Sequence, residues 1–270
     1  MSKIESGLYQ LGRLDRLAAQ DTSVHRLDPR AKVVTTLAFL VCVVSFRKYE
    51  VLPMLPFAIF PIALASAGNL PLGYLARKLV VVAPFAIVVG VFNPLLDRAV
   101  MVQIGSFGLS GGWVSFASIL VRFALTTSAA LVLIGTTSFN GVCMALERLG
   151  APDVFATQLL FLYRYIFVLG EEAMSMTRAR ALRSFGGRGM SMRVYASMMG
   201  HLLLRTYDRA HRVYLAMLSR GFDGQIRVMR RLHLGVRDVA FTLGWCAAFG
   251  VFRMYNVPLL LGQTITRVIT

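Results

Sequence analysis

Five long runs of apolar residues mark the sequence; four follow one another closely and the fifth lies near the end. Runs at or near the length of a hydrocarbon core are typical of transmembrane helices, and the first, which is short, is expected to borrow a turn from the preceding segment. Residues 105–112 are rich in glycine and are expected to form a loop before the fourth run. The predicted spans are Val33–Phe46, Val51–Ala67, Leu79–Leu96, Trp113–Thr137 and Val239–Leu261.

The polar region 138–237 has apolar positions at helical spacing with arginines between them. This pattern predicts three helices, at about 153–169, 171–185 and 193–220. The first is apolar enough to be a sixth span, but Arg164 in its middle favours a helix at the membrane interface. The predicted fold class is therefore all-α: a polytopic integral membrane protein with about five transmembrane helices and three cytoplasmic or interfacial helices.

The first span has a start signal, Asp28 followed by Pro29. An acidic N-cap accepts a hydrogen bond from a free backbone N–H, and proline fits the first helical position because no N–H is needed there. Arg30 and Lys32 follow within the first turn. Their long side chains are expected to reach the lipid headgroups.

Composition and charge add an orientation. Of the 270 residues 56% are hydrophobic and 16% charged, and the formal net charge is +16. If the N-terminus is inside, 23 of the 29 Lys and Arg residues lie on the cytoplasmic side, as the positive-inside rule expects. Nucleic-acid binding would explain the charge but not the apolar runs.

The expected organisation is that of a multi-pass protein of the inner (plasma) membrane, with its N-terminus and its polar helices in the cytoplasm. Residues 1–32 carry no signal-peptide core, so insertion is expected to depend on the later spans. Four parts are predicted: a cytoplasmic segment 1–32, transmembrane helices in 33–137, a cytoplasmic region 138–237, and the last transmembrane helix with the C-terminus in 238–270.

A five-residue phrase occurs twice in the polar region, as Arg-Ser-Phe-Gly-Gly at 183–187 and Arg-Gly-Phe-Asp-Gly at 220–224. Each copy closes a run rich in Met and Arg. Glycine past a helix end commonly takes a left-handed conformation, and an arginine in the last turn faces the negative end of the helix dipole. Two ordinary helix caps are one interpretation. The other is a pair of helices whose terminal arginines bind carboxylates of a partner protein.

The sequence lacks the usual motifs of catalysis. It contains no G-x-x-x-x-G-K-[ST] phosphate loop, and its four histidines lack ligand spacing, so neither ATP hydrolysis by this chain nor a resident metal or cofactor is expected. Cys42, Cys143 and Cys246 lie in apolar context and are expected to be buried thiols. Arg122 and Arg253 fall within predicted spans, where an ionisable residue is either functional or hydrogen-bonded between helices.

Three stretches resemble one family: Ser23–Lys32, Phe92-Asn93-Pro94 and, above all, the two arginine phrases. The chain is similar over nearly its full length to the transmembrane (T) component of energy-coupling factor (ECF) transporters, most closely the CbiQ type of cobalt or nickel importers. In that family, two Ala-Arg-Gly-like motifs end cytoplasmic coupling helices, and each arginine docks into one subunit of an ABC ATPase pair. The resemblance assigns the second motif to Ser219-Arg220-Gly221. The first motif corresponds to Leu182-Arg183-Ser184, which departs from the pattern on both sides of the arginine, and Arg180 competes for its role.

The resemblance implies a non-catalytic coupling subunit of an ATP-driven importer. Its partners would be two CbiO-like ABC ATPases, a CbiM-like substrate-specific membrane component, a CbiN-like small subunit, and lipid, with no nucleic acid. The metal follows from the resemblance alone, so a T component for a vitamin such as biotin remains an alternative. A self-sufficient secondary permease would need inverted repeats and polar mid-span residues, and an intramembrane enzyme would need a catalytic cluster.

Overall fold

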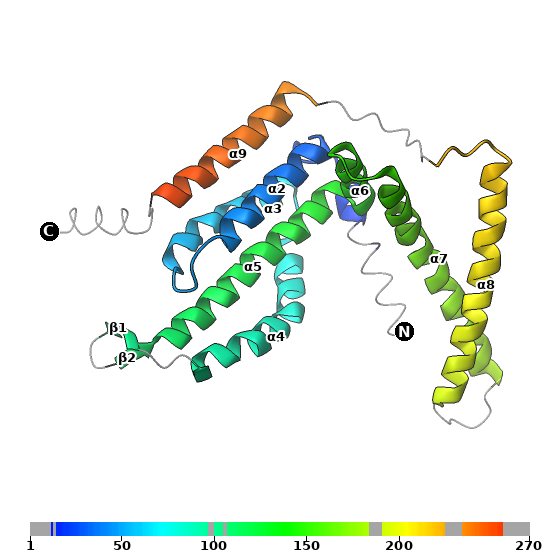
Figure 1. Ribbon diagram of the computed structural model, residues 1–270, viewed down its shortest axis with the longest axis horizontal. Helices are drawn as coiled ribbons and strands as arrows, with labels where there is room; N and C mark the ends of the chain where they lie inside the picture. The colour runs from blue at the N-terminus through cyan, green and yellow to red at the C-terminus, as the bar shows by residue number, and fades with distance from the viewer. Residues whose placement is uncertain are drawn as a thin grey trace. The chain divides into compact units, whose positions relative to one another are not determined.

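The computed structural model describes residues 12, 15–96, 100–104, 107–183, 191–224 and 234–255. The predicted all-α class is confirmed, with one short β-hairpin as an addition (Figure 1). The chain forms two compact units. We call Arg16–Ser138 with Leu232–Thr270 the aromatic-core unit, and Met1–Asp15 with Phe139–Arg231 the helical-hairpin unit.

The aromatic-core unit contains the helices that correspond to the five predicted spans. Their bounds are α2 (Pro29–Val44), the 3₁₀ helix η1 (Leu52–Ala58), α3 (Ile59–Ala67), α4 (Leu72–Leu96), α5 (Gly111–Thr137) and α9 (Val236–Met254). Helix α4 begins seven residues before the predicted span and includes Pro84 and Pro94 within its length.

Helix α2 begins as the sequence predicts. The Asp28 carboxylate accepts a hydrogen bond of 2.9 Å from the Arg30 backbone N–H, and Pro29 occupies the first helical position. The expectation for Lys32 is wrong, because this side chain is only 3% exposed. Its Nζ donates to the carbonyl oxygen of Thr136, at 2.9 Å, instead of reaching outward. A carbonyl near the end of α5 thus replaces the headgroups as the partner of this ammonium.

The predicted span Val51–Ala67 is divided between two kinds of helix. Its first part is η1, in which Pro53 lies at the start and Pro56 lies inside. Proline removes a backbone donor and clashes with the preceding turn of an α-helix, so the tighter and shorter 3₁₀ form precedes the α-helical part.

Two short strands lie next to and within the region where a glycine-rich loop is expected. Strands β1 (Val100–Ile104) and β2 (Phe107–Ser110) pair antiparallel, with Ile104 opposite Phe107 and an irregular register between Val100 and Val102. The Val-Met-Val-Gln-Ile run contains β-branched residues, which favour a strand. The glycines that follow it favour a loop, and the prediction rested on them. The hairpin leads directly into α5.

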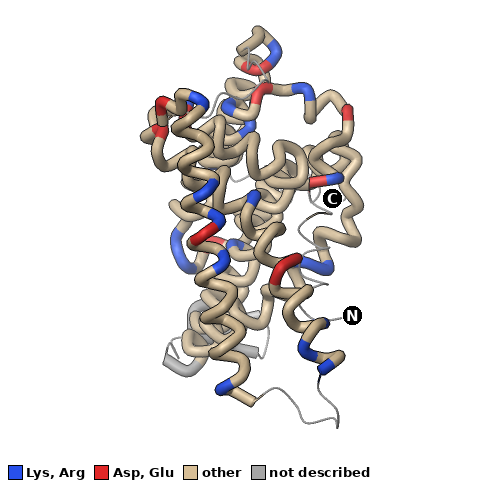
Figure 2. The backbone as a smooth tube through the Cα atoms, turned by 90° about the vertical axis from the view of Figure 1, so that its right-hand side faces the viewer, with Lys and Arg blue, Asp and Glu red and all other residues tan. Residues whose placement is uncertain are grey.

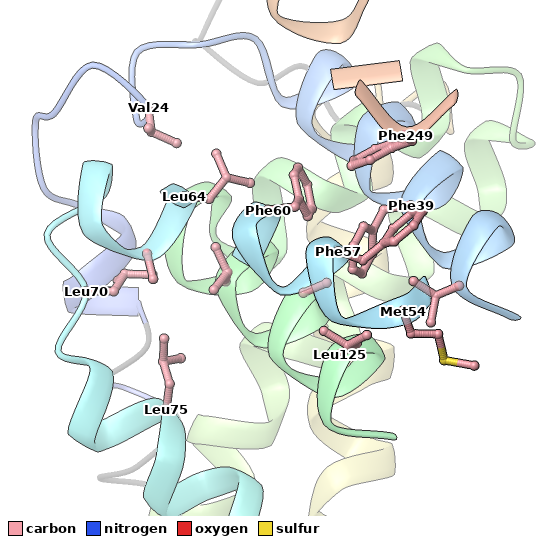
Figure 3. Packing of buried hydrophobic residues seen from close by; sticks show 14 of the residues in the cluster. Val24, Phe39, Met54, Phe57, Phe60, Leu64, Leu70, Leu75, Leu125 and Phe249 are labelled. Carbon is pink, nitrogen blue, oxygen red and sulfur yellow. The ribbon is translucent and has the colours of Figure 1, made fainter. Parts of the chain in front are cut away.

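The core of the aromatic-core unit is a cluster of buried apolar residues in which phenylalanines from α2, η1, α3 and α9 pack against one another (Figure 3). The Phe39 and Phe60 rings stack with centroids 4.8 Å apart, and Phe249 meets the Phe60 ring edge-on at 5.2 Å. Phe57 lies 5.9 Å from Phe249. Such pairs add about 0.5–1.5 kcal/mol each to the area they bury, so this cluster fixes α9 against α2 although about 200 residues separate them in the sequence.

The outward surfaces of several helices are apolar, as lipid contact requires. On α4, Val80, Val81 and Phe85 are 68–72% exposed. A soluble domain rarely exposes a continuous apolar surface of this kind. Within the described part of the chain, three helical segments are long and apolar enough to cross a membrane: Leu72–Pro94, Gly111–Thr137 and Asp153–Arg183. The total number of spans stays a prediction.

The helical-hairpin unit contains α6 (Phe139–Arg148), α7 (Asp153–Arg183) and α8 (Met192–Leu218). Helices α7 and α8 run antiparallel as two long arms (Figure 1). The predicted division into helices 153–169 and 171–185 is wrong, because α7 continues through Gly170. One glycine costs a helix only about 1 kcal/mol and does not end it. Helix α6 has no counterpart in the sequence prediction.

Candidate functional site

The second arginine phrase follows α8 and forms a glycine-dependent helix end. The Phe222 N–H donates to the Met217 carbonyl at 3.1 Å, and the Gly221 N–H donates to the Leu218 carbonyl at 3.0 Å. This pair of bonds defines a Schellman motif. Gly221 has φ +76°, in the left-handed region that favours glycine. The predicted left-handed cap is therefore confirmed for this copy.

Arg220 lies between the last turn of α8 and this glycine. Its backbone N–H donates to the Met217 carbonyl at 3.0 Å, and the neighbouring Ser219 hydroxyl donates to the Leu215 carbonyl at 2.9 Å. The Arg220 side chain is exposed and has no hydrogen-bond or ion-pair partner among the residues the structure describes. The local backbone is thus satisfied internally, and the guanidinium group is left available.

The first phrase begins at the C-terminal end of α7. Arg183 is the last residue of that helix and is exposed, and Leu182 beside it is 81% exposed. Ser184, Gly186 and Gly187 lie outside the described residues, so the cap predicted for this copy is not described. The competing Arg180 is half-buried. Exposure therefore favours Arg183 over Arg180 as the residue available to a partner.

The antiparallel arrangement places the two arginines at opposite ends of the arms. Helix α8 alone has 27 residues. At 1.5 Å per residue it is about 40 Å long, so Arg183 and Arg220 are separated by a distance of that order. One small ligand could not contact both.

An apolar groove lies between the N-terminal half of α7 and the C-terminal half of α8, beside the second phrase. It has a volume of about 760 Å³, and its wall includes Phe161 and Tyr165 of α7 and Met217 of α8. Phe222, the aromatic residue of the second phrase, also lines it. The phrase therefore combines an exposed cation with an aromatic side chain that continues an apolar surface.

The two arginines in predicted spans are bonded to the end of α2. The Arg122 side chain donates to the Phe46 carbonyl at 2.9 Å, and Arg253 donates to the Ser45 carbonyl at 3.1 Å. The Arg253 guanidinium also lies over the Phe46 ring, 4.0 Å from its centroid. Carbonyls at a helix C-terminus carry partial negative charge, so these contacts match the hydrogen-bonding interpretation given from the sequence.

The described residues offer no group of three or more His, Cys, Asp or Glu side chains that could hold a metal ion. Cys143 is buried as expected, whereas Cys42 and Cys246 are half-buried; all three are free thiols. Among the predicted site residues that the structure describes, Arg183 and Arg220 are exposed at or just beyond a helix end.

Comparison with known proteins assigns a family. A family model described as cobalt transport protein, CbiQ, matches residues 20–231, which include both arginine phrases. The chain belongs to the CbiQ family. It is 30% identical to the energy-coupling factor transporter transmembrane protein EcfT of Heliobacterium modesticaldum, over 86% of this chain and 91% of the relative. It is 29% identical to the cobalt transport protein CbiQ of Rhodobacter capsulatus, over 81% and 88%, respectively. An uncharacterized protein of Methanocaldococcus jannaschii is 30% identical over 82% of this chain and 78% of its own length.

This membership makes the chain a transmembrane component of an ECF transporter, as the resemblance in the sequence predicts. It does not favour the alternative of a self-sufficient permease. The phrases that carried the resemblance lie at the two helix ends with exposed arginines, and Arg122 and Arg253 lie in the other unit.

Proposed function

We propose that this protein transmits ATP-driven motion from a pair of ABC ATPases to a substrate-binding membrane component, for the uptake of cobalt, or of nickel as the alternative metal. The observation that carries the proposal is the pair of exposed arginines at opposite ends of α7 and α8. Two sites about 40 Å apart suit two separate partner subunits better than one. Arginine binds a carboxylate through two parallel hydrogen bonds, which gives each contact a defined direction as well as energy.

In this proposal the roles of the other subunits are taken from the family. The ATPases, CbiO-like, would hydrolyse ATP, and a CbiM-like component with a CbiN-like small subunit would bind the metal. This chain would be non-catalytic and would bind neither a cofactor nor nucleic acid. Its relative from R. capsulatus is named a cobalt transport protein, and this name supports the metal; a vitamin remains the competing substrate.

The proposed orientation places the N-terminus and the helical-hairpin unit in the cytoplasm, where the ATPases are. Figure 2 shows that blue Lys and Arg positions outnumber red Asp and Glu positions along the chain, 29 against 13 in the sequence. Most of the basic residues lie before residue 33 or between residues 138 and 237. The positive-inside rule therefore supports this orientation.

Charge reversal at the helix ends tests the coupling role. Arg220→Glu should release the ATPases, and Arg183→Glu should weaken their binding less. A carboxylate facing a carboxylate loses the charged pair and adds repulsion, which costs about 2–5 kcal/mol for a desolvated pair, or at least thirtyfold in affinity. The measurement is ATPase co-purification with the tagged chain, together with uptake of radioactive cobalt.

The matched control is Arg212→Glu. Arg212 is an exposed arginine of α8, eight residues before Arg220, and its reversal changes the net charge equally. It should leave co-purification intact. Unchanged ATPase binding and uptake in the Arg183→Glu/Arg220→Glu double variant would disprove the coupling role, and uptake of biotin in place of cobalt would favour the vitamin alternative.

A further inference from the structure

The sequence stretch that opens α2 also belongs to the resemblance, yet it plays no part in the arginine helix ends. His25, Asp28 and Lys32 of this stretch are buried, and Asp238 of α9 is buried with them. We call these four residues the α2 junction; all four belong to the aromatic-core unit. Buried ionisable groups are costly unless specific partners hold them, so the partners indicate what the junction does.

The chain passes between its two units at three places: after Asp15, after Ser138 and after Arg231. At the first passage, the Tyr163 hydroxyl donates to the Asp15 carboxylate at 2.6 Å within the helical-hairpin unit. Two residues later, within the aromatic-core unit, His25 Nε2 binds the Leu17 carbonyl at 3.1 Å. The chain is therefore fixed by a side-chain hydrogen bond on each side of this passage.

At the second passage, the Lys32 ammonium group holds the end of α5 through the Thr136 carbonyl. Ser138 then takes φ +62°, an uncommon conformation for a residue with a side chain, and its N–H donates to the Ile134 carbonyl at 3.0 Å. Helix α6 begins at the next residue. Ser138, a single residue in a left-handed conformation, thus connects α5, to which Lys32 is hydrogen-bonded, to α6 of the other unit.

At the third passage, the Asp238 carboxylate joins the start of α9 to the start of α2. One oxygen accepts from the Gly235 N–H and the other from the Asp28 N–H, both at 2.8 Å. The chain enters the aromatic-core unit at Leu232, only three residues before Gly235. All three passages are therefore held by His25, Asp28 or Lys32 within a few residues of the point where the chain changes unit.

The stability of the fold does not require an ammonium group at position 32. A buried charge must be removed from water, and replacing buried charged groups by apolar side chains of similar volume is often neutral or stabilising. What the ammonium group provides is a directed bond to the negative end of α5. A hydrogen bond fixes the distance and direction between donor and acceptor within narrow limits, so it couples the position of α2 to that of the end of α5.

We propose that the α2 junction is the transmission point of this protein, at which movement of the helical-hairpin unit is passed to α2, α5 and α9 together. Lys32 and Asp238 act as positioning residues in this step: they bind neither ATPase nor substrate. The inference rests on the proposed coupling function, and it assigns a role to the Ser23–Lys32 stretch.

The experiment compares Lys32→Met with Lys48→Met in the complete transporter. Lys48 is exposed, so its substitution makes the same chemical change outside the junction. Lys32→Met should keep its ATPases but transport roughly five- to a hundredfold less substrate per ATP hydrolysed, the range of usual coupling energies. Lys48→Met should behave as wild type. Asp238→Asn keeps the volume but replaces one of the two acceptor oxygens by a donor NH₂ group, so it should lower the same ratio. It is the variant to use if Lys32→Met proves unstable.

Hydrogen exchange gives an outcome that does not depend on transport. Amides at the end of α5 and around Ser138 should exchange faster in Lys32→Met than in Lys48→Met, while the rest of α5 is unchanged. Wild-type exchange there, an unchanged ratio of transport to ATP hydrolysis, or a loss of uptake that only matches a loss of assembled complex would overturn the inference. Failure of the proposed function appears separately, as absence of ATPases from the wild-type preparation.

Discussion

His25 is held as a neutral imidazole by two hydrogen bonds. A carbonyl oxygen can only accept, so Nε2 donates to Leu17, and Nδ1 accepts from the Thr22 hydroxyl at 2.7 Å. Burial lowers the pKa of His25, and the positive charge of Lys32 lowers it further, against smaller opposing effects of the Gly135 and Leu17 backbone and of Asp21. Protonation would place a buried cation beside the Lys32 ammonium group.

Stability should therefore fall as the pH falls through the ordinary histidine range. Because the folded pKa lies below the unfolded value, the unfolded chain binds the proton first, and stability is full only above the unfolded pKa. Between pH 7.5 and pH 5.5 the wild type should lose on the order of a few degrees more of melting temperature than His25→Gln. Thermal unfolding in detergent at both pH values measures this, and equal losses would exclude His25 as the source.

Sequence reasoning at single residues succeeded where the partner was near in the chain. The Asp28 cap was predictable because its acceptor and donor are two residues apart. The partner of Lys32 was not, because Thr136 lies 104 residues away and a buried lysine looks, in sequence, like one at a membrane surface. For Arg122 and Arg253 the kind of bond was foreseen, but the shared end of α2 could come only from the fold.

The end of α8 depends on glycine for its backbone conformation and not for space. A Cβ at Gly221 would meet no atom within 4 Å, so the cost of a side chain there is that of φ +76° alone. Gly200, inside the same helix, is equally unobstructed but lacks a positive φ. Substitutions at Gly221 and Gly200 therefore separate two effects of glycine: its tolerance of a positive φ and its cost in backbone entropy.

Gly221→Ala should destabilise the end of α8 by about 1–2 kcal/mol, the cost of a left-handed residue with a side chain. Gly200→Ala should have the opposite sign and stabilise the helix by roughly 0.5–1 kcal/mol, because alanine loses less backbone entropy. Hydrogen exchange of the last-turn amides, with the free energy of unfolding, measures both. If Gly221→Ala has no effect on these amides, the left-handed end does not exist in solution, and Arg220 is presented differently.

The apolar runs predict that these elements exist. They predict less well which type of helix each one forms and where it ends. The sequence pattern predicts two helices on either side of Gly170, yet no proline is present there to end α7. Helix α6 follows a left-handed serine, and serine gives no reliable turn signal at that position. The 3₁₀ form of η1 has a local signal in its prolines, whereas the left-handed conformation of Ser138 has none in the neighbouring sequence.

The topology of the whole molecule depends on whether α7 crosses the membrane. Its span candidate is the least apolar of the three, and Arg164 lies near the middle of its apolar half. A central arginine costs about 2.5–3.5 kcal/mol on insertion scales. Crossing would also move the arginines of α8 to the opposite side from those of residues 1–32. Both effects favour an α7 that lies at the membrane surface.

Site-directed labelling decides between the two topologies. In a variant without Cys42, Cys143 and Cys246, single cysteines replace Lys48, between the first two predicted spans, and Ser191, between α7 and α8. Lys48→Cys should react with a membrane-impermeant maleimide in intact cells, and Ser191→Cys should react only after permeabilisation, because the positive-inside rule predicts a cytoplasmic position for the arginine-rich hairpin. Labelling of Ser191→Cys in intact cells would mean that α7 crosses the bilayer, and Arg220 would then lie on the side away from any cytoplasmic ATPase.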